Sequence, residues 1–329
     1  MVKKKSLLRV DAGVPRQATS APQGAEVDLD YYAQHLVTSN SRNGRPYSPG
    51  TIHNYLRCAR LLVRWLDGRP LTAACDVATF NEFLRWYLAE HDVNGTAFVQ
   101  RHLRNLFNWI EREEGVASPF RSRDLDTYTA RKTKPKVLAR EFINDLLATC
   151  ASRSFYDVRD RAVIRLLLEG LRVGEVLAIR PEDVPPLTDP VLRVVPSKGE
   201  LAYADGHGRR VLLALETARD LHRYVRARHR HPMAQSAPEL WLGATHKPWE
   251  YDGVRQMLAR RSRRAGYDAH ATAHMFRHTF SHDWLDNGGS AENLMQRNGW
   301  TSVSMVQRYG KDMAENRAIE ATRRMGPLY

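Results

Sequence analysis

The sequence predicts a mainly helical protein of two domains, with a small β-sheet confined to the second domain. Apolar residues recur at the helical period through most of residues 26–128, and a basic stretch poor in apolar residues, 129–137, then interrupts this pattern. Beyond it, helical segments surround two short runs of strand-forming residues. A chain of 329 residues is also long enough to form two hydrophobic cores of ordinary size.

The charge of the chain predicts a polyanionic partner. Its 50 lysines and arginines outnumber its 37 aspartates and glutamates, which leaves a formal net charge of +13. Most of the positive charge comes from arginine, whose planar fork binds a phosphate through two hydrogen bonds. We therefore expect nucleic acid rather than a membrane surface as the partner, and an ordinary basic protein remains the alternative.

Cysteine content and hydropathy indicate the compartment. Cys58, Cys75 and Cys150 lie far apart without a CxxC pair, so the sequence suggests neither a disulfide framework nor a cysteine-based zinc site. No stretch approaches the roughly 20 apolar residues of a membrane span, and the apolar run near the basic N-terminus is too short for a signal peptide. A soluble protein of a reducing cytoplasm, with no membrane partner, is expected.

The first domain is predicted to be a small helical bundle with one basic side. Residues 1–25 lack periodicity and are expected to form a flexible basic tail, which either lies along a phosphate backbone or is simply solvated. Ser48 and Pro49 cap a helix whose apolar stripe begins at Ile52. Similar stripes follow from Phe80 and from Val99. The arginines off these stripes, expected to face DNA phosphates, are Arg57, Arg60, Arg64, Arg101 and Arg104.

The second domain follows the linker 129–137. Helical patterns run near 139–151 and 159–169, and Gly170 is a plausible helix stop before a further helix that opens around Arg172 and Glu175. Residues 191–195 and 210–213 are predicted strands that flank a turn at Lys198 and a second glycine-rich turn. The remainder, 214–325, is predicted to be mostly helical.

The segment from His274 to Tyr309 groups the parts needed to attack a phosphodiester. His274 and Arg277 offer cationic donors, Trp300 an indole N–H, and Tyr309 a hydroxyl group. Charge gathers on the non-bridging oxygens of a phosphate during displacement, and fixed donors lower that barrier. A phenol, with a free pKa of about 10, is a weak nucleophile unless a base or a strongly positive site lies beside it.

Taken together, these motifs resemble the tyrosine recombinase (phage integrase) family. The resemblance rests on Gly170-Leu171-Arg172-Val173-Gly174-Glu175, Lys198-Gly199, His274-x-x-Arg277-His278-Thr279-Phe280, Gly299-Trp300 and Tyr309, in order and spacing. Each motif alone is weak, and the set is specific. The family likeness implies a core-DNA-binding domain at 26–128, a catalytic domain at 138–329, and a C-shaped clamp of both around DNA.

The resemblance also implies a role for each site residue. Arg172 and Arg277 would clamp the scissile phosphate, and His274 and Trp300 would donate hydrogen bonds to it, with His274 also a candidate to manage the proton of Tyr309. Lys198 would be the general acid for the departing 5′ oxygen. Glu175 would pair with a neighbouring cation or histidine, against the alternative of a solvated helix charge.

Two departures from the family pattern qualify this assignment. Trp300 stands where members often have histidine, and an indole can donate but not accept a proton, so positioning and packing are its expected part. The stretch after Lys198 is longer than the compact hairpin of many members.

The implied activity is site-specific DNA recombination through a 3′-phosphotyrosyl intermediate, without cofactor or metal. Integration and excision of a mobile element is the preferred interpretation, because Asn298-Gly299-Trp300 departs from the Leu-Gly-His pattern typical of Xer resolvases. Alternatives are an Xer-like resolvase of chromosome or plasmid dimers, a type IB topoisomerase-like enzyme and a catalytically silent DNA-binding protein.

Expected partners are double-stranded recombination sites, three further copies in a tetramer on DNA, and an accessory directionality factor. The expected location is the bacterial cytoplasm or nucleoid, with a phage origin left open.

Histidine spacing supports a rival hypothesis of a zinc hydrolase. His270, His274, His278 and His282 recur every four residues, a spacing that places metal ligands on one helix face. The absence of an acidic third ligand and the presence of Arg277 argue against it. A second basic run, which contains His222, His229 and His231 interleaved with arginines, is predicted to be a solvated helix end.

Overall fold

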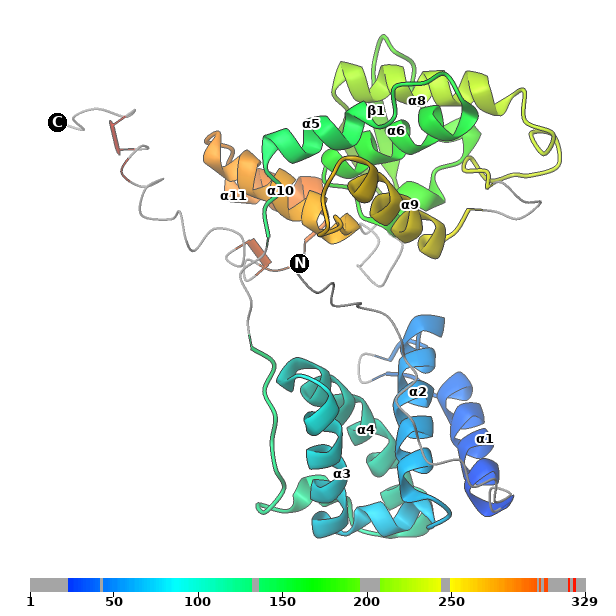
Figure 1. Cartoon of the computed structure of the whole chain (residues 1–329), viewed down its shortest axis with the longest axis vertical. Coiled ribbons are helices and arrows are strands. Elements are labelled where there is room, and N and C mark those ends of the chain that lie inside the picture. The colour runs from blue at the N-terminus through cyan, green and yellow to red at the C-terminus, as the bar shows by residue number, and fades with distance from the viewer. Residues whose placement is uncertain are drawn as a thin grey trace, which may run out of the picture. The chain divides into compact units, whose positions relative to one another are not determined.

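The computed structural model describes residues 23–41, 44–131, 136–195, 208–243, 249–300, 302, 305–306, 319 and 322–323. The chain divides into two compact units, Met1–Thr133 and Lys134–Tyr329 (Figure 1). The division falls inside the segment 129–137, where the sequence places a linker. The predicted fold class, mainly helical with a small sheet in the second unit, is confirmed.

The first unit is an all-helical bundle in its described part. Ser48 caps the second helix with its hydroxyl oxygen, which accepts from the Thr51 N–H at 3.2 Å, and Pro49 occupies the first helical turn as predicted. The aromatic rings of Phe80, Phe107 and Phe120 meet edge to face or tilted in its core. The elements are α1 (Gln23–Thr38), α2 (Pro49–Leu66), the 3₁₀ helix η1 (Leu71–Cys75), α3 (Val77–Glu90), α4 (Val93–Glu114) and the 3₁₀ helix η2 (Pro119–Arg121).

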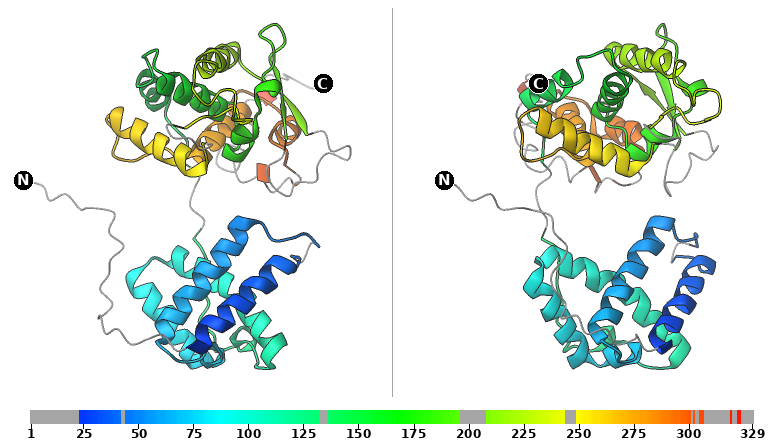
Figure 2. Two further views of the ribbon diagram at one scale, coloured as in Figure 1. Left: turned by 90° about the vertical axis from the view of Figure 1, so that its right-hand side faces the viewer. Right: turned by 45° about the vertical axis from the view of Figure 1, so that its right-hand side comes forward.

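The second unit packs helices around α6 and carries a two-stranded antiparallel sheet. Its described elements are α5 (Arg140–Ala148), α6 (Phe155–Leu168), α7 (Val173–Ala178), the 3₁₀ helix η3 (Pro181–Asp183), β1 (Val191–Val194), β2 (Arg209–Leu212), α8 (Leu215–Arg228), α9 (Tyr251–Arg264), α10 (Ala273–Asp286) and α11 (Ala291–Asn298). Helix α6 contacts both α8 and α10. The strands lie at one edge of this unit (Figure 2), in a register that pairs Val191 with Leu212 and Val194 with Arg209.

Alternation along β2 sets the environment of the sheet. Arg209 and Val211 face the core, whereas Arg210 and Leu212 face solvent, because successive side chains of a strand point to opposite faces. On β1, Leu192 joins the same core. The structure begins β2 one residue earlier than the sequence predicts, and this residue proves decisive for the site.

Two glycines allow the chain turns that shape the site. Gly170 ends the α6 segment with φ of +81°, and a Cβ there would lie 2.5 Å from the Phe280 ring, so both backbone conformation and packing require glycine. Gly299 ends α11 with φ of +62°, in the left-handed conformation common after a helix. Both conformations end a helical segment, and the predicted site residues Arg172 and Trp300 follow within two residues.

Two interpretations of histidine-rich segments are wrong. Helix α10 begins at Ala273, so His270 precedes it and the four histidines do not share one helix face. The basic end of α8 is not wholly solvated, because Arg228 is 4 % exposed. Its guanidinium donates to the carbonyls of Ala234, Ala237, Glu239 and Leu240, since the following segment folds back against the helix end. Within the described residues, no helix is both long and apolar enough to span a bilayer.

Candidate active site

The site begins at the N-terminus of α7. Arg172 immediately precedes the helix, and its backbone N–H donates to Glu175 Oε2 at 2.8 Å. A glutamate in the third helical position can reach back to this N–H, which no helical carbonyl satisfies. The Arg172 guanidinium also donates from Nη1 to Glu175 Oε1 at 3.0 Å. The Arg172 side chain remains 30 % exposed, whereas that of Glu175 is fully buried.

Arg209 of β2 holds the same carboxylate from the other side. Its Nη1 donates to Oε1 and its Nη2 to Oε2 of Glu175, each at 2.8 Å, in a two-pronged ion pair. Sequence reasoning did not single out Arg209. The available signal was the pair Arg209-Arg210 at the start of a strand. Successive side chains of a strand point to opposite faces of the sheet, so one of two adjacent arginines faces the core when one face of the sheet is buried.

The Glu175 carboxylate is held in its charged form. Burial raises its pKa, but the hydrogen bonds and charge of Arg209 outweigh burial, and the Arg172 N–H and Arg277 add to them, so the pKa lies below its usual range. A lowered folded-state pKa stabilises the protein above the unfolded-state pKa of about 4.3, and that contribution is lost as the pH falls through the folded value.

Glu175→Gln is therefore expected to destabilise the protein by roughly 3–5 kcal/mol at neutral pH, because it leaves Arg209 buried without a counter-charge. The difference from wild type should shrink as the pH falls below about 4.3, because the unfolded wild-type chain then binds a proton that the folded Glu175 carboxylate, with its lowered pKa, does not yet bind. Urea unfolding followed by circular dichroism between pH 3 and 8 measures this. The exposed Glu182→Gln is the matched control, and an equal effect of both substitutions at pH 7 would contradict the prediction.

Arg277 of α10 connects three segments of the second unit. It is 3 % exposed, and its Nη1 and Nη2 donate to the carbonyls of Gly170 at 2.8 Å and Asn298 at 2.6 Å. Its Nη1 also lies 3.9 Å from Glu175 Oε2. Its guanidinium carbon lies 5.2 Å from the centroid of the Trp300 ring. Arg277 therefore ties the turn after α6 and the end of α11 to α10.

His274 and Trp300 occupy different environments beside Arg277. His274 is exposed, three residues before Arg277 on the same helix, and its ring centroid lies 4.1 Å from that of His278 in an edge-to-face arrangement. Trp300 is 6 % exposed and packs with Leu285, Leu294 and Val306. The structure thus brings together Arg172, Glu175, Arg277 and Trp300 in one cluster with Arg209.

Two predicted site residues, Lys198 and Tyr309, lie outside the described residues. In sequence, Lys198 belongs to the stretch that joins β1 to β2, and Tyr309 follows the short described segment at residues 305–306. Their roles remain predictions.

The five arginines predicted to face DNA lie on α2 and α4 of the first unit. Arg57, Arg60, Arg64, Arg101 and Arg104 are all exposed. The guanidinium groups of Arg57 and Arg101 lie 5.4 Å and 5.9 Å from the ring centroid of Phe98, which brings a cation of α2 and one of α4 to the same ring. Arg104 lies 4.7 Å from the ring of Phe120 instead. The first unit therefore presents several arginines to solvent.

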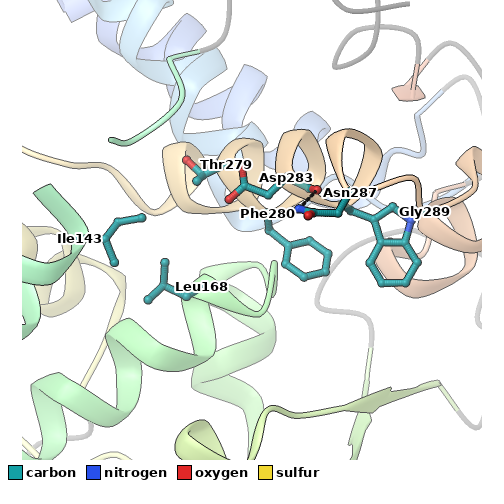
Figure 3. A pocket seen from close by; sticks show the side chains of 8 residues that line it. Ile143, Leu168, Thr279, Phe280, Asp283, Asn287 and Gly289 are labelled. Atoms are coloured by element: carbon teal, nitrogen blue, oxygen red, sulfur yellow. Dashed lines mark hydrogen bonds between the residues drawn. The ribbon is translucent and has the colours of Figure 1, made fainter. Parts of the chain in front are cut away.

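A separate apolar pocket lies between α5, α6 and α10 (Figure 3). It has a volume of about 440 Å³ and includes none of the predicted site residues; its lining is Ile143, Leu168, Thr279, Phe280, Asp283, Trp284, Asn287 and Gly289. Phe280, which closes over Gly170, also lies 4.7 Å from the Arg297 guanidinium. The pocket is thus a neighbour of the charged cluster and not part of it.

The described residues offer no set of metal ligands. Within them, no three histidine, cysteine, aspartate or glutamate side chains lie close enough together to hold a metal ion. The zinc hypothesis drawn from histidine spacing therefore has no ligand set in this part of the chain.

Comparisons with known proteins identify the family of this chain. The sequence model described as "Phage integrase family" matches residues 136–316. The chain is 27 % identical over 265 residues to "Tyrosine recombinase XerD" of Ralstonia nicotianae. This alignment covers 79 % of this chain and 82 % of the relative. It is also 27 % identical over 290 residues to "Tyrosine recombinase XerC" of Nitrobacter winogradskyi. This alignment covers 82 % of this chain and 85 % of the relative.

Solved structures share the fold. The Tn1549 transposon integrase in complex with circular intermediate DNA superposes with a TM-score of 0.65 at 16 % identity, over 91 % of this chain and 99 % of the other. The XerH recombinase bound to difH substrate superposes with a TM-score of 0.64 at 16 % identity, and the match covers 92 % of this chain and 97 % of the other. The family match spans more than half of the chain and includes every catalytic position predicted above. The chain therefore belongs to the phage integrase family, the tyrosine recombinases, which are enzymes that cleave and rejoin DNA.

Proposed function

We propose that this protein recombines DNA at specific sites, with Tyr309 as the nucleophile. The phenolic oxygen, whose proton passes to His274, attacks the scissile phosphorus, and the bond from phosphorus to the 5′ oxygen breaks. The products are a 3′-phosphotyrosyl link and a 5′ hydroxyl, to whose oxygen Lys198 gives a proton. Rejoining is the reverse step with a new 5′ hydroxyl, and the phosphotyrosyl link keeps the energy of the broken bond.

The observation that carries the proposal is the cluster of Arg172, Arg209 and Arg277 around one buried carboxylate. Three guanidinium groups against one Glu175 leave the cluster positively charged, in surroundings where water screens charge weakly. Such a site stabilises the charge that develops on the non-bridging phosphate oxygens. The partly exposed Arg172 and the exposed His274 are the side chains placed to meet that phosphate first.

Arg277 has a second role in this proposal. A guanidinium carries five N–H donors, so it can hold the Gly170 and Asn298 carbonyls and still donate to a phosphate oxygen. Since these carbonyls fix its plane before DNA arrives, little reorganisation is needed at the moment of reaction. Trp300 packs beside it and supports this orientation.

The direct test is capture of a covalent adduct. The chain is incubated with a pool of duplexes that carry a random central sequence and a nick, so that the short 5′-hydroxyl strand diffuses away after cleavage. A band of chain plus DNA that survives denaturation is expected, and sequencing of its DNA identifies the site. Binding without any adduct would indicate a catalytically silent DNA-binding protein. Relaxation of supercoiled DNA without paired sites would indicate a topoisomerase.

For the biological reaction, we propose integration and excision of a mobile element. Asn298 and Trp300, in place of the Leu-Gly-His pattern of Xer resolvases, support this choice. The second candidate is dimer resolution, which is favoured by relatives named XerC and XerD at 26–29 % identity over most of both chains. A resolvase recombines two identical copies of the captured site, whereas an integrase requires two different sites. Plasmids that carry each pair distinguish the two.

We further propose that both units bind one DNA core site as a clamp and that four protomers exchange strands between two duplexes. The exposed arginines of α2 and α4 support a DNA contact by the first unit. An accessory factor would then set the direction of the reaction. Analytical ultracentrifugation of the adduct complex with two sites tests the tetramer.

The clamp predicts a specific salt dependence. Replacement of Arg57, Arg60, Arg101 and Arg104 with alanine in the full chain should flatten the slope of log K against log salt by up to ~4 units, because each phosphate contact releases about 0.9 counterion. Fluorescence anisotropy on the captured duplex measures the slope. The control replaces Arg85 and Arg121, which pair with Asp126 and Glu111 and should change it little. An unchanged slope in the fourfold variant would show that this side is merely solvated.

A further inference from the structure

Arg209 is the least exposed strand arginine of the described sheet and lies at the centre of the charged cluster. It is 4 % exposed, although its neighbour Arg210 on the same strand faces solvent. A buried guanidinium requires partners for its N–H groups. All three nitrogens of Arg209 have one: Nη1 and Nη2 donate to Glu175, and Nε donates to the Arg297 carbonyl at 2.6 Å.

These contacts join two elements that carry predicted catalytic groups. Glu175 lies in α7, whose N-terminus presents Arg172. The Arg297 carbonyl belongs to the last turn of α11, and the next carbonyl, that of Asn298, accepts from Arg277. The last carbonyls of a helix lack helical partners and carry partial negative charge, so they suit two guanidinium donors side by side. Arg209 and Arg277 therefore hold the chain together just before Trp300.

Arg209 also controls how Glu175 is shared. Each oxygen of this carboxylate accepts one hydrogen bond from Arg209 and one from Arg172. Without the Arg209 fork, the buried carboxylate would turn toward Arg172, which already donates to it and whose guanidinium, unlike that of Arg277, is not held by two backbone carbonyls. Such a turn would withdraw the Arg172 guanidinium from the surface, where it is 30 % exposed and placed to meet a phosphate.

From these contacts we infer that Arg209 is a positioning residue of the cleavage reaction, which orients Arg172 through Glu175 and the Trp300 segment through the Arg297 carbonyl. The inference rests on the proposed function. All three nitrogens of Arg209 already donate to Glu175 or to the Arg297 carbonyl, so it acts through the groups it holds. Loss of Arg209 should therefore slow the chemical step and leave DNA affinity nearly unchanged.

The test compares Arg209→Met and Arg209→Lys with the control Arg210→Met. The control removes the same charge from the next residue of β2, whose side chain faces solvent. Adduct formation is followed in single turnover at saturating concentrations of the captured nicked duplex. We expect Arg209→Met to slow cleavage by about 100-fold, as loss of a preorganised donor does, with a Kd within about threefold of wild type. Arg209→Lys should recover part of the rate, because it restores charge without the fork. Arg210→Met should keep the wild-type rate.

Two further measurements separate positioning from a loss of folding. On a duplex with a neutral methylphosphonate at the scissile position, the Arg209→Met defect should fall below about fivefold, since less negative charge needs stabilisation there. An equally large defect on both substrates would indicate general damage to the fold and overturn the inference. The double variant Arg209→Met/Glu175→Gln should be no slower than Arg209→Met alone, because the pair acts as a unit.

The outcomes separate this inference from the proposed function. If wild type forms no adduct with any duplex, the proposed function fails and the inference fails with it. If wild type forms the adduct and folded Arg209→Met forms it at the same rate, the inference fails alone. Thermal melting of each variant, with assays kept well below its midpoint, shows which proteins are folded. If Arg209→Met is unfolded, a rate of Arg209→Lys equal to wild type overturns the inference.

Discussion

Tyr309→Phe is expected to abolish the covalent protein–DNA adduct and to leave the Kd for the captured duplex within about twofold of wild type. Only the attacking oxygen is lost, and a phenyl ring offers no other nucleophile. Denaturing gel electrophoresis of nicked-duplex reactions gives the adduct, and fluorescence anisotropy gives the affinity. The control is Tyr251→Phe, which removes an exposed hydroxyl at the start of α9 and should leave both quantities unchanged. Adduct formation by Tyr309→Phe would remove this residue from the mechanism.

Arg277→Ala is expected to have the next largest effect, because Arg277 supports both the fold and the proposed chemistry. Loss of a preorganised donor to the phosphate should slow cleavage by about 10²- to 10³-fold. The substitution also leaves the buried carbonyls of Gly170 and Asn298 without this donor, which costs roughly 1–3 kcal/mol for each. Single-turnover cleavage and urea unfolding measure the two effects.

The two effects of Arg277 can be separated. Arg277→Lys keeps the positive charge but cannot reach both carbonyls with the geometry of a planar fork. Arg277→Lys should therefore restore a larger share of the lost stability than of the lost cleavage rate. The exposed Arg226→Ala on α8 is the control for loss of charge and should change neither quantity appreciably. A wild-type cleavage rate in a folded Arg277→Ala variant would contradict the proposed site.

Local signals predicted the helices well. Ser48 and Pro49 predicted the start of α2, and the structure places the cap and the first turn there. Gly170 predicted the end of α6, and its left-handed backbone conformation ends the helix as expected. The spacing from Arg172 to Glu175 put both residues at one helix N-terminus, where they contact each other. In each case the contacts join residues at most four positions apart, so sequence alone contains the needed information.

Burial of individual charged side chains was harder to predict. Sequence reasoning treated the arginines around residue 228 alike, yet Arg228 is buried against carbonyls of the segment 234–240 whereas Arg226 is exposed. The histidine spacing suggested one helix face, yet His270 lies before the first turn of α10. A side chain's burial depends on what packs over it, and that partner is often set by distant parts of the chain.

By itself, the sequence determined the helical class, and it predicted both the break between two units and the residues proposed to attack and stabilise a phosphate. These properties depend on periodicity, on composition and on motifs of a few residues. Only the tertiary structure decided that Arg209 and not Arg210 binds Glu175, and that Arg277 reaches the carbonyls of Gly170 and Asn298. Those contacts span 21 to 107 residues of sequence. The register of a short strand and the packing of α10 against α6 set them, and neither can be read from local propensity, because a shift of one residue in β2 would exchange the buried and the exposed arginine.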